Sequence, residues 1–301
     1  MVALVGMGLL SLPAFGAEPA RPGTLNYVEG TAYLGGKLLN DRDVGSTDLD
    51  AGQVLSTGQG KAEMLLTPGI YLRLDDNSAV KMVSPDLAMT NVDLERGEAG
   101  VEVDEIYKQN NVRVTDDGVP TQLLKPGFYE FNADGTERTF KGEAAVDEGD
   151  GKYRMVKSHH EFQLSELDTA RPLDKEKPVG FDVGAAQDNL YNWSSLRSQY
   201  LAEANNQIAG EYGGAGFYPG WFWDPWMWDY TFIGPGPFWS PFGFGYYPFG
   251  WGGWYGGFYG RGLYGHPRIG GIGRGGFYGG GGFHGGFGGG GFHGGGGGGR
   301  R

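Results

Sequence analysis

The sequence predicts an all-β protein, an antiparallel sandwich or roll, followed by one amphipathic helix and a glycine-rich tail. From Thr24 to about Leu167, short alternating runs of apolar and polar residues recur between turn signals such as Asp76-Asn77 and Asp134-Gly135. Helical spacing replaces this alternation after residue 184, and glycine and aromatic residues dominate beyond residue 210. The chain has 301 residues and 60 glycines, so only about the first two thirds can supply an ordinary hydrophobic core.

Residues 1–17 have the pattern of an export signal. MVALVGMGLLSLPAFGA is an apolar run that ends in small residues, which suits cleavage after Gly16 or Ala17, although it lacks the usual basic start. The alternative is a short apolar extension that packs as a strand. The run is too short to span a bilayer, and no other segment approaches roughly 20 apolar residues. We therefore expect an exported protein, periplasmic or associated with the cell envelope, without a transmembrane span.

Residues 24–105 form the first predicted β unit. Its clearest strands are AEMLLT at 62–67 and IYLRL at 70–74, with the turn Pro68-Gly69 between them. Alternate side chains of a strand point to opposite faces of a sheet. Ile70, Leu72 and Leu74 are therefore expected on one face, and Tyr71 and Arg73 on the other.

Residues 106–168 form a second, degenerate β unit, because two signatures of the first unit recur in order. LLTPGIYLRLDDNS at 65–78 matches LLKPGFYEFNADGT at 123–136 at six of fourteen positions, and RGEAGV at 96–101 matches KGEAAV at 141–146. An internal repeat of this kind indicates a duplicated structural unit. The alternative is chance, because Pro-Gly and Asp-Gly turns are common in all-β chains.

Residues 171–184 are a polar linker broken by prolines, and residues 185–209 form the predicted helix, with Asp188 as N-cap and Gly210 as its end. We expect the helix to pack its apolar stripe on the sheet. The stripe consists of Leu190, Trp193, Leu196 or Arg197, Tyr200, Leu201 and Ala204.

The remainder has two parts of low complexity. Residues 210–260 are rich in Trp, Tyr, Phe, Pro and Gly and are expected to be adhesive and only partly ordered, whereas the glycine of residues 261–301 predicts disorder. Aromatic rings can stack on sugars, on membrane interfaces and on each other. The predicted interaction residues are Trp221, Trp223, Trp226, Trp228, Trp239, Tyr246, Tyr247, Trp251 and Trp254. The alternative is an extension without function.

Composition argues against several classes of function. The net charge is −12 and its acidic excess lies before residue 211, which disfavours nucleic acid as a partner. Cysteine is absent, which excludes thiolate metal sites and thiol nucleophiles. His159 and His160 are adjacent on a predicted strand and would face opposite sides. We expect no catalytic residues, no cofactor and no metal; a carbohydrate-acting carboxylate pair and calcium at Asp-rich turns remain lesser alternatives.

The first unit resembles the FecR domain. The resemblance rests on a "G-x-x-L-x-T-G-x-x-S/K-A" step, a Pro-Gly to Ser stretch and a closing "L-x-x-G-x-x-x-V". These motifs fall on Gly52, Leu55, Thr57, Gly58 and Ala62, on Pro68-Gly69 through Ser78, and on Leu94, Gly97 and Val101. It covers residues 24–105 well and residues 111–164 as a degenerate copy, and it implies an all-β extracytoplasmic domain.

The resemblance implies a function only broadly. FecR itself relays an iron-siderophore signal to a sigma factor through a transmembrane helix, which this sequence lacks. The chain is more similar to stand-alone exported FecR-domain proteins with aromatic tails. We therefore expect a non-enzymatic envelope module that contacts glycan, the outer membrane or envelope proteins. A periplasmic signal-sensing regulator is the alternative.

Overall fold

The computed structural model describes residues 19–164, 177–211 and 218–250. The predicted signal at 1–17, part of the linker, the glycine-rich tail, Trp251 and Trp254 lie outside the described residues.

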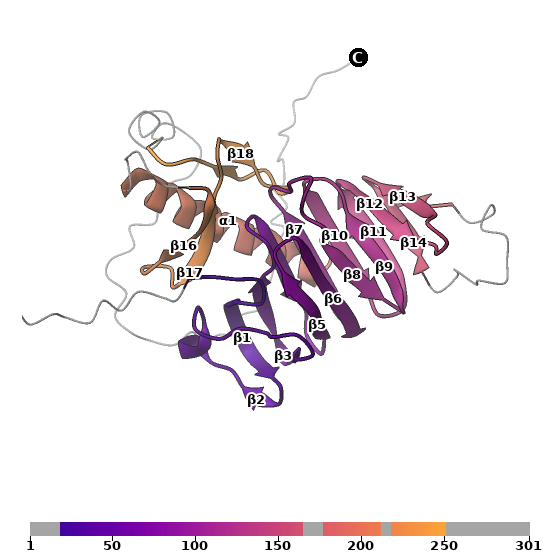
Figure 1. Cartoon of the computed structure of the whole chain (residues 1–301), viewed down its shortest axis with the longest axis horizontal. Coiled ribbons are helices and arrows are strands. Elements are labelled where there is room, and N and C mark those ends of the chain that lie inside the picture. The colour runs from indigo at the N-terminus through magenta and orange to yellow at the C-terminus, as the bar shows by residue number, and fades with distance from the viewer. Residues whose placement is uncertain (1–18, 165–176, 212–217, 251–301) are drawn as a thin grey trace, which may run out of the picture. The chain divides into compact units, whose positions relative to one another are not determined.

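Within the described residues, a single sheet of fifteen strands contains almost all of the β structure (Figure 1). Its order is β13-β12-β9-β8-β6-β5-β3-β4-β7-β10-β11-β14-β15, with β1 and β2 attached along β3. The strands are β1 (Leu25–Leu34), β2 (Lys37–Leu38), β3 (Val54–Leu65), β4 (Ile70–Leu74), β5 (Ala79–Asp86), β6 (Met89–Arg96), β7 (Glu98–Val103), β8 (Arg113–Asp116), β9 (Val119–Leu123), β10 (Gly127–Asn132), β11 (Thr136–Lys141), β12 (Glu143–Asp147), β13 (Tyr153–Lys157), β14 (His160–Gln163) and β15 (Val179–Gly180).

The sheet folds into two layers at β3. The first residues of β3 pair with β5, and its last residues pair with β4. The first layer comprises β5, β6, β8, β9, β12 and β13, and the second layer comprises β4, β7, β10, β11, β14 and β15. All neighbours are antiparallel except β6 and β8. The all-β prediction with a single following helix is confirmed, and strands of both predicted units share one sheet because β7 pairs with β10.

One apolar core fills the space between the layers. Ile70, Leu72 and Leu74 belong to it, together with side chains such as Val92 from the first layer. Tyr71 and Arg73 point to the opposite, outer face of the second layer, as alternation predicts.

The two copies of the Pro-Gly signature flank β7 on opposite sides. Tyr71 of β4 lies opposite Glu102, whereas Tyr129 of β10 lies opposite Val101. A register difference of one residue reverses the face to which a side chain points. Tyr71 therefore points to the outer face and Tyr129 into the core, so the identical letters do not occupy equivalent places.

The second signature marks places where the chain crosses between layers. Gly97 joins β6 to β7 with φ 77°, and Gly142 joins β11 to β12 with φ 111°. A Cβ on Gly142 would lie 2.1 Å from the Tyr129 hydroxyl. The repeated glycine is therefore required by backbone conformation and by space.

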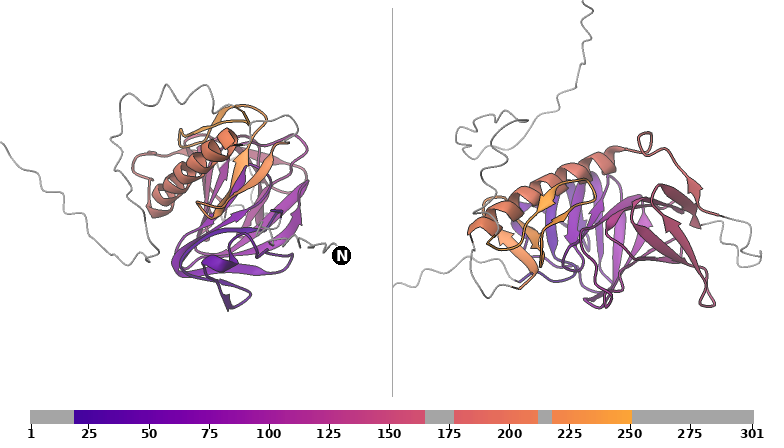
Figure 2. Two further views of the ribbon diagram at one scale, coloured as in Figure 1. Left: turned by 90° about the vertical axis from the view of Figure 1, so that its left-hand side faces the viewer. Right: turned by 90° about the horizontal axis from the view of Figure 1, so that it is seen from above.

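Helix α1 (Asn189–Glu211) lies over the outer face of the second layer (Figure 2). Asp188 caps it, because its Oδ1 accepts the N–H of Tyr191 at 2.9 Å, and the helix runs one residue beyond the predicted stop at Gly210. Leu196 is exposed and Arg197 is buried, so of these two alternatives Arg197 belongs to the buried stripe. Tyr200 is exposed, so its predicted place in the stripe is wrong. The buried side of α1 includes polar residues because the sheet face beneath it is itself charged.

Residues 218–250 form two hairpins, β16 (Gly220–Asp224) with β17 (Asp229–Ile233) and β18 (Phe238–Trp239) with β19 (Gly245–Tyr246). Phe232 and Tyr246 are fully buried beside Tyr71 and Leu201. This aromatic segment therefore packs against the sheet and α1 as part of the folded body.

Candidate functional site

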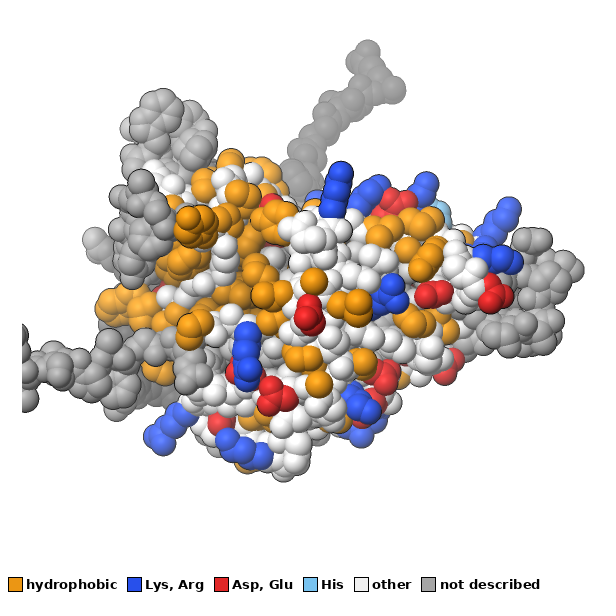
Figure 3. Space-filling model, in the orientation of Figure 1, with side chains coloured by type: hydrophobic (Ala, Val, Ile, Leu, Met, Phe, Trp, Pro, Cys, Tyr) orange, Lys and Arg blue, Asp and Glu red, His pale blue; other side chains and the backbone are white. Residues whose placement is uncertain are grey.

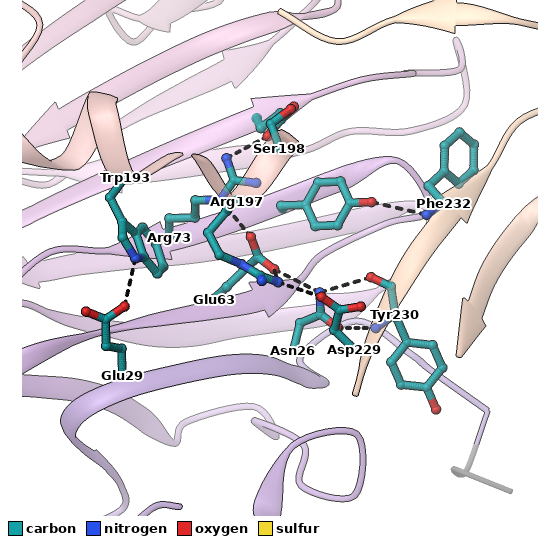
Figure 4. A network of polar contacts seen from close by, with 12 residues as sticks. Asn26, Glu29, Glu63, Arg73, Trp193, Arg197, Ser198, Asp229, Tyr230 and Phe232 are labelled. Carbon is teal, nitrogen blue, oxygen red and sulfur yellow. Dashed lines mark hydrogen bonds and ion pairs between the residues drawn. The ribbon is translucent and has the colours of Figure 1, made fainter. Parts of the chain in front are cut away.

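A buried network of charges joins the second layer, α1 and β17 (Figure 4). Arg73 approaches Glu63 at 2.7 Å through Nε and Glu102 at 2.6 Å through Nη1, and none of the three side chains is exposed. The Oγ of Ser198 donates to Glu102 at 2.6 Å. These contacts hold the middle of α1 on the sheet.

Arg197 extends this network from α1 to β17, the second strand of the first hairpin. Its Nη2 lies 2.9 Å from Glu63 and 3.0 Å from Asp229, and its guanidinium carbon lies 4.1 Å from the centre of the Tyr27 ring. Asn26 completes the junction by exchanging two hydrogen bonds with the backbone of Tyr230. One arginine thus positions an aromatic ring of β1 and a hairpin that lies about 200 residues later.

The pKa values of this network reflect burial and pairing. Burial raises the pKa of Glu63, but Arg197 and Arg73 outweigh burial and lower it to about 2. For Asp229 burial outweighs the attraction of Arg197, so its pKa is raised to about 6. These groups are closed to solvent and serve to attach the hairpin.

The turn between β16 and β17 carries three exposed apolar residues, Trp226, Met227 and Trp228. Asp224 holds this turn, because its buried Oδ1 accepts the backbone N–H groups of Trp226 at 2.7 Å and Met227 at 3.3 Å. Trp228 has φ 59°, a left-handed conformation that is unusual for a bulky residue. The indole N–H of Trp228 donates to the carbonyl of Asp41 at 3.2 Å.

A pocket of about 400 Å³ opens between this turn, β1 and the short helical turn η1 (Asp41–Asp43). It is lined by Tyr27, Val28, Asp41, Arg42, Val44, Met227 and Trp228. Trp223 contacts the pocket residue Trp228 edge to face, with 5.3 Å between the ring centres. Trp223 also packs on Gly45, where a Cβ would lie 2.6 Å from its indole.

The lining of the pocket combines aromatic rings with polar groups. Partial burial raises the pKa of Tyr27, so its phenol stays neutral and can donate or accept a hydrogen bond. Asp41 and Arg42 are exposed and offer an acceptor and several donors. A volume of this size and such a lining are typical of sites for small organic ligands.

The nine predicted interaction residues divide into three groups. Trp226, Trp228 and Trp239 are exposed, at 78%, 53% and 64%. Figure 3 shows that hydrophobic side chains gather on the surface where β16 to β18 lie. Trp221, Trp223 and Tyr247 are half-buried in packing contacts, and Tyr246 is fully buried. Trp251 and Trp254 lie outside the described residues.

Sequence reasoning missed six of the seven residues that line the pocket, namely Tyr27, Val28, Asp41, Arg42, Val44 and Met227. Tyr27 lies in an ordinary strand pattern, and Asp41 and Arg42 lie in a polar turn, so no local signal distinguishes them. Only Met227 had a usable signal, its position between two predicted tryptophans.

Other candidate chemistry is sparse among the described residues. His159 lies in a turn with φ 64°, and His160 begins β14 with Nδ1 3.0 Å from the Ser158 carbonyl oxygen. One group of carboxylates, Glu98, Glu130 and Asp188, lies close enough to share a metal ion. No helix within the described ranges is long and apolar enough to cross a membrane.

Comparison with known proteins yields distant structural similarities. No protein-family model matches the chain, and no curated protein matches it. Two solved structures, at 2.50 Å and 1.65 Å resolution, are each described as "a putative anti-sigma factor from Parabacteroides distasonis ATCC 8503". Each is 10% identical to this chain, with TM-scores of 0.33 and 0.34, and each match covers 48% of this chain and 64% of the other. TM-scores in this range leave the family of this chain open.

Proposed function

We propose that the protein is an exported, FecR-like and non-enzymatic module of the bacterial envelope that binds glycan. The FecR-like part of this proposal rests on the motifs of residues 24–105. The glycan-binding part rests on one observation, the pocket whose lining combines Trp228, Tyr27 and Met227 with Asp41 and Arg42.

Sugars suit such a pocket for two physical reasons. The C–H faces of a pyranose ring stack on aromatic rings, and its hydroxyl groups need both donors and acceptors. Trp228 and Tyr27 supply the rings, and Arg42 and Asp41 supply the polar partners. The strained backbone of Trp228 and its bond to Asp41 hold the indole in place before a ligand arrives.

Calorimetry with full-length protein tests the proposal. The ligands are soluble peptidoglycan fragments, lipopolysaccharide core oligosaccharide and a capsular polysaccharide. We expect saturable binding of one of these three ligands. Its affinity should be at least tenfold lower for Trp228→Ala and for Arg42→Ala. Trp239→Ala is the matched control, because Trp239 is exposed but does not line the pocket.

Absence of binding across the panel, or equal losses in Trp228→Ala and Trp239→Ala, would contradict the proposal. Release of sugar from any ligand would favour a carbohydrate-acting enzyme. A changed transcriptome on deletion, without glycan binding, would favour the regulatory alternative.

A further inference from the structure

Three carboxylates from distant parts of the chain meet on the outer face of the second layer. Glu130 lies opposite Gly100 and Asn132 lies opposite Glu98 in the pairing of β10 with β7, so Glu98 and Glu130 are diagonal neighbours on one face. Asp188, the N-cap of α1, lies next to both of them. One oxygen of each carboxylate lies within 4.8 Å of the other two.

Glu130 has an incomplete set of partners. Its side chain is 1% exposed, and Oε1 lies 3.3 Å from Nη1 of Arg138. Oε2 is buried without a hydrogen-bond partner. A buried carboxylate oxygen without a donor is costly, so a cation bound to this atom would stabilise the folded chain.

The two neighbouring cations also pair with carboxylates outside this group. Arg138 makes its shorter contact with Glu161, at 2.8 Å through Nε, and Lys61 pairs with Asp75. Three carboxylates this close repel one another when they are ionised, and a cation bound between them would offset that repulsion.

We propose that Glu98, Glu130 and Asp188 bind one hard divalent cation, Ca²⁺, which joins the start of α1 to the second layer. All three ligands are oxygens, which Ca²⁺ prefers. Ligands on opposite sides of one Ca²⁺ lie roughly 4.6–5.2 Å apart, so a separation of up to 4.8 Å suits it. Asp188 can cap the helix through Oδ1 and still offer its other oxygen.

Sequence spacing could not have predicted this site. Glu98, Glu130 and Asp188 are separated by 32 and 58 positions and match no metal-binding motif. They come together only because β7 and β10 are neighbours and α1 begins above them.

Titration of full-length, EDTA-treated protein with CaCl₂ tests the site by calorimetry and thermal unfolding. We expect one bound ion per chain and a rise in Tm of roughly 5 °C at saturation. Glu130→Gln and Asp188→Asn should weaken binding at least tenfold. Asn preserves the helix cap, and Gln mimics a protonated Glu130, so both variants should remain folded in EDTA. Glu203→Gln, an exposed position on α1, is the control and should bind as the wild type does.

Two results would overturn the proposal. One is the absence of both binding heat and a change in Tm when CaCl₂, MgCl₂ or MnCl₂ is added at roughly 10 mM. That concentration is about ten times the roughly millimolar dissociation constant of weak calcium-binding modules. The other is binding that Glu130→Gln and Asp188→Asn leave unchanged.

Discussion

The two faces of the second layer are both buried, yet they are closed in different ways. The inner face is covered by aliphatic side chains such as Leu72 and Val101. The outer face presents Glu63, Arg73 and Glu102 and is covered by α1 and the hairpins of residues 218–250. Apolar packing is non-directional and tolerates many partners, whereas buried charges require specific ones. The outer face therefore determines which segment can cover it.

The largest effect that would test this contrast is expected from Arg197→Met. The change leaves Glu63 and Asp229 buried with a missing partner and should lower the free energy of unfolding by about 3–5 kcal/mol. Urea unfolding measures it. Arg21→Met is the control, because its ion pair with Asp48 is exposed and should contribute at most about 1 kcal/mol. Equal losses in both variants would show that the buried pairs have no special role.

Leu72→Ala tests the inner face. Leu72 is 1% exposed in the core, and its truncation should lower the free energy of unfolding by about 3 kcal/mol through lost burial and a cavity. Leu38→Ala, at an exposed position of β2, should change it by less than about 0.5 kcal/mol. A loss below about 1 kcal/mol at Leu72 would mean that the two layers are not closely packed.

Glu137→Gln tests a carboxyl group that is buried on the inner face. Glu137 lies fully buried opposite Phe131 and Phe162, and burial raises its pKa to about 8. The folded state therefore keeps a proton that the unfolded chain has lost, so stability falls as pH rises from about 5 through 8. Glu137→Gln should reduce this loss by on the order of 2 kcal/mol between pH 6 and 8.

Urea unfolding at several pH values measures the effect. Glu95→Gln, an exposed position, should retain the wild-type dependence on pH. If Glu137→Gln retains it as well, Glu137 does not carry the raised pKa.

The smallest effect is expected from Tyr71→Phe on the outer face. The Tyr71 hydroxyl accepts the backbone N–H of Phe232 at 3.2 Å, and its loss leaves that buried N–H unpaired. We expect about 1 kcal/mol of destabilisation, against none for the exposed Tyr218→Phe. A neutral Tyr71→Phe would indicate that β17 is held by its ion pairs and apolar packing alone.

Much of the sheet could be predicted because its inner face follows a local rule. The alternation of Ile70, Leu72 and Leu74 identified the core side of β4, and Asp188 identified the start of α1. The order of the strands could not be predicted, because pairing across β7 depends on contacts between residues far apart in the sequence.

The candidate site was predictable only in part. Trp226 and Trp228 are visible as aromatic residues, and the structure places Trp228 in the pocket wall. Tyr246 resembles them in the sequence but is fully buried, because β19 packs it beside Tyr71. Exposure depends on which neighbours cover a ring, and composition does not contain that information.

The sequence by itself determined the all-β class, the position of the single helix and the inner face of the strands, because these follow from local periodicity and turn chemistry. Tertiary structure alone decided that the charged outer face is buried, that Arg197 joins it to Asp229, and that Glu98, Glu130 and Asp188 meet. A polar residue on a strand looks the same whether it faces water or a buried partner. The difference arises only when segments distant in the chain supply the opposite charge or leave it missing.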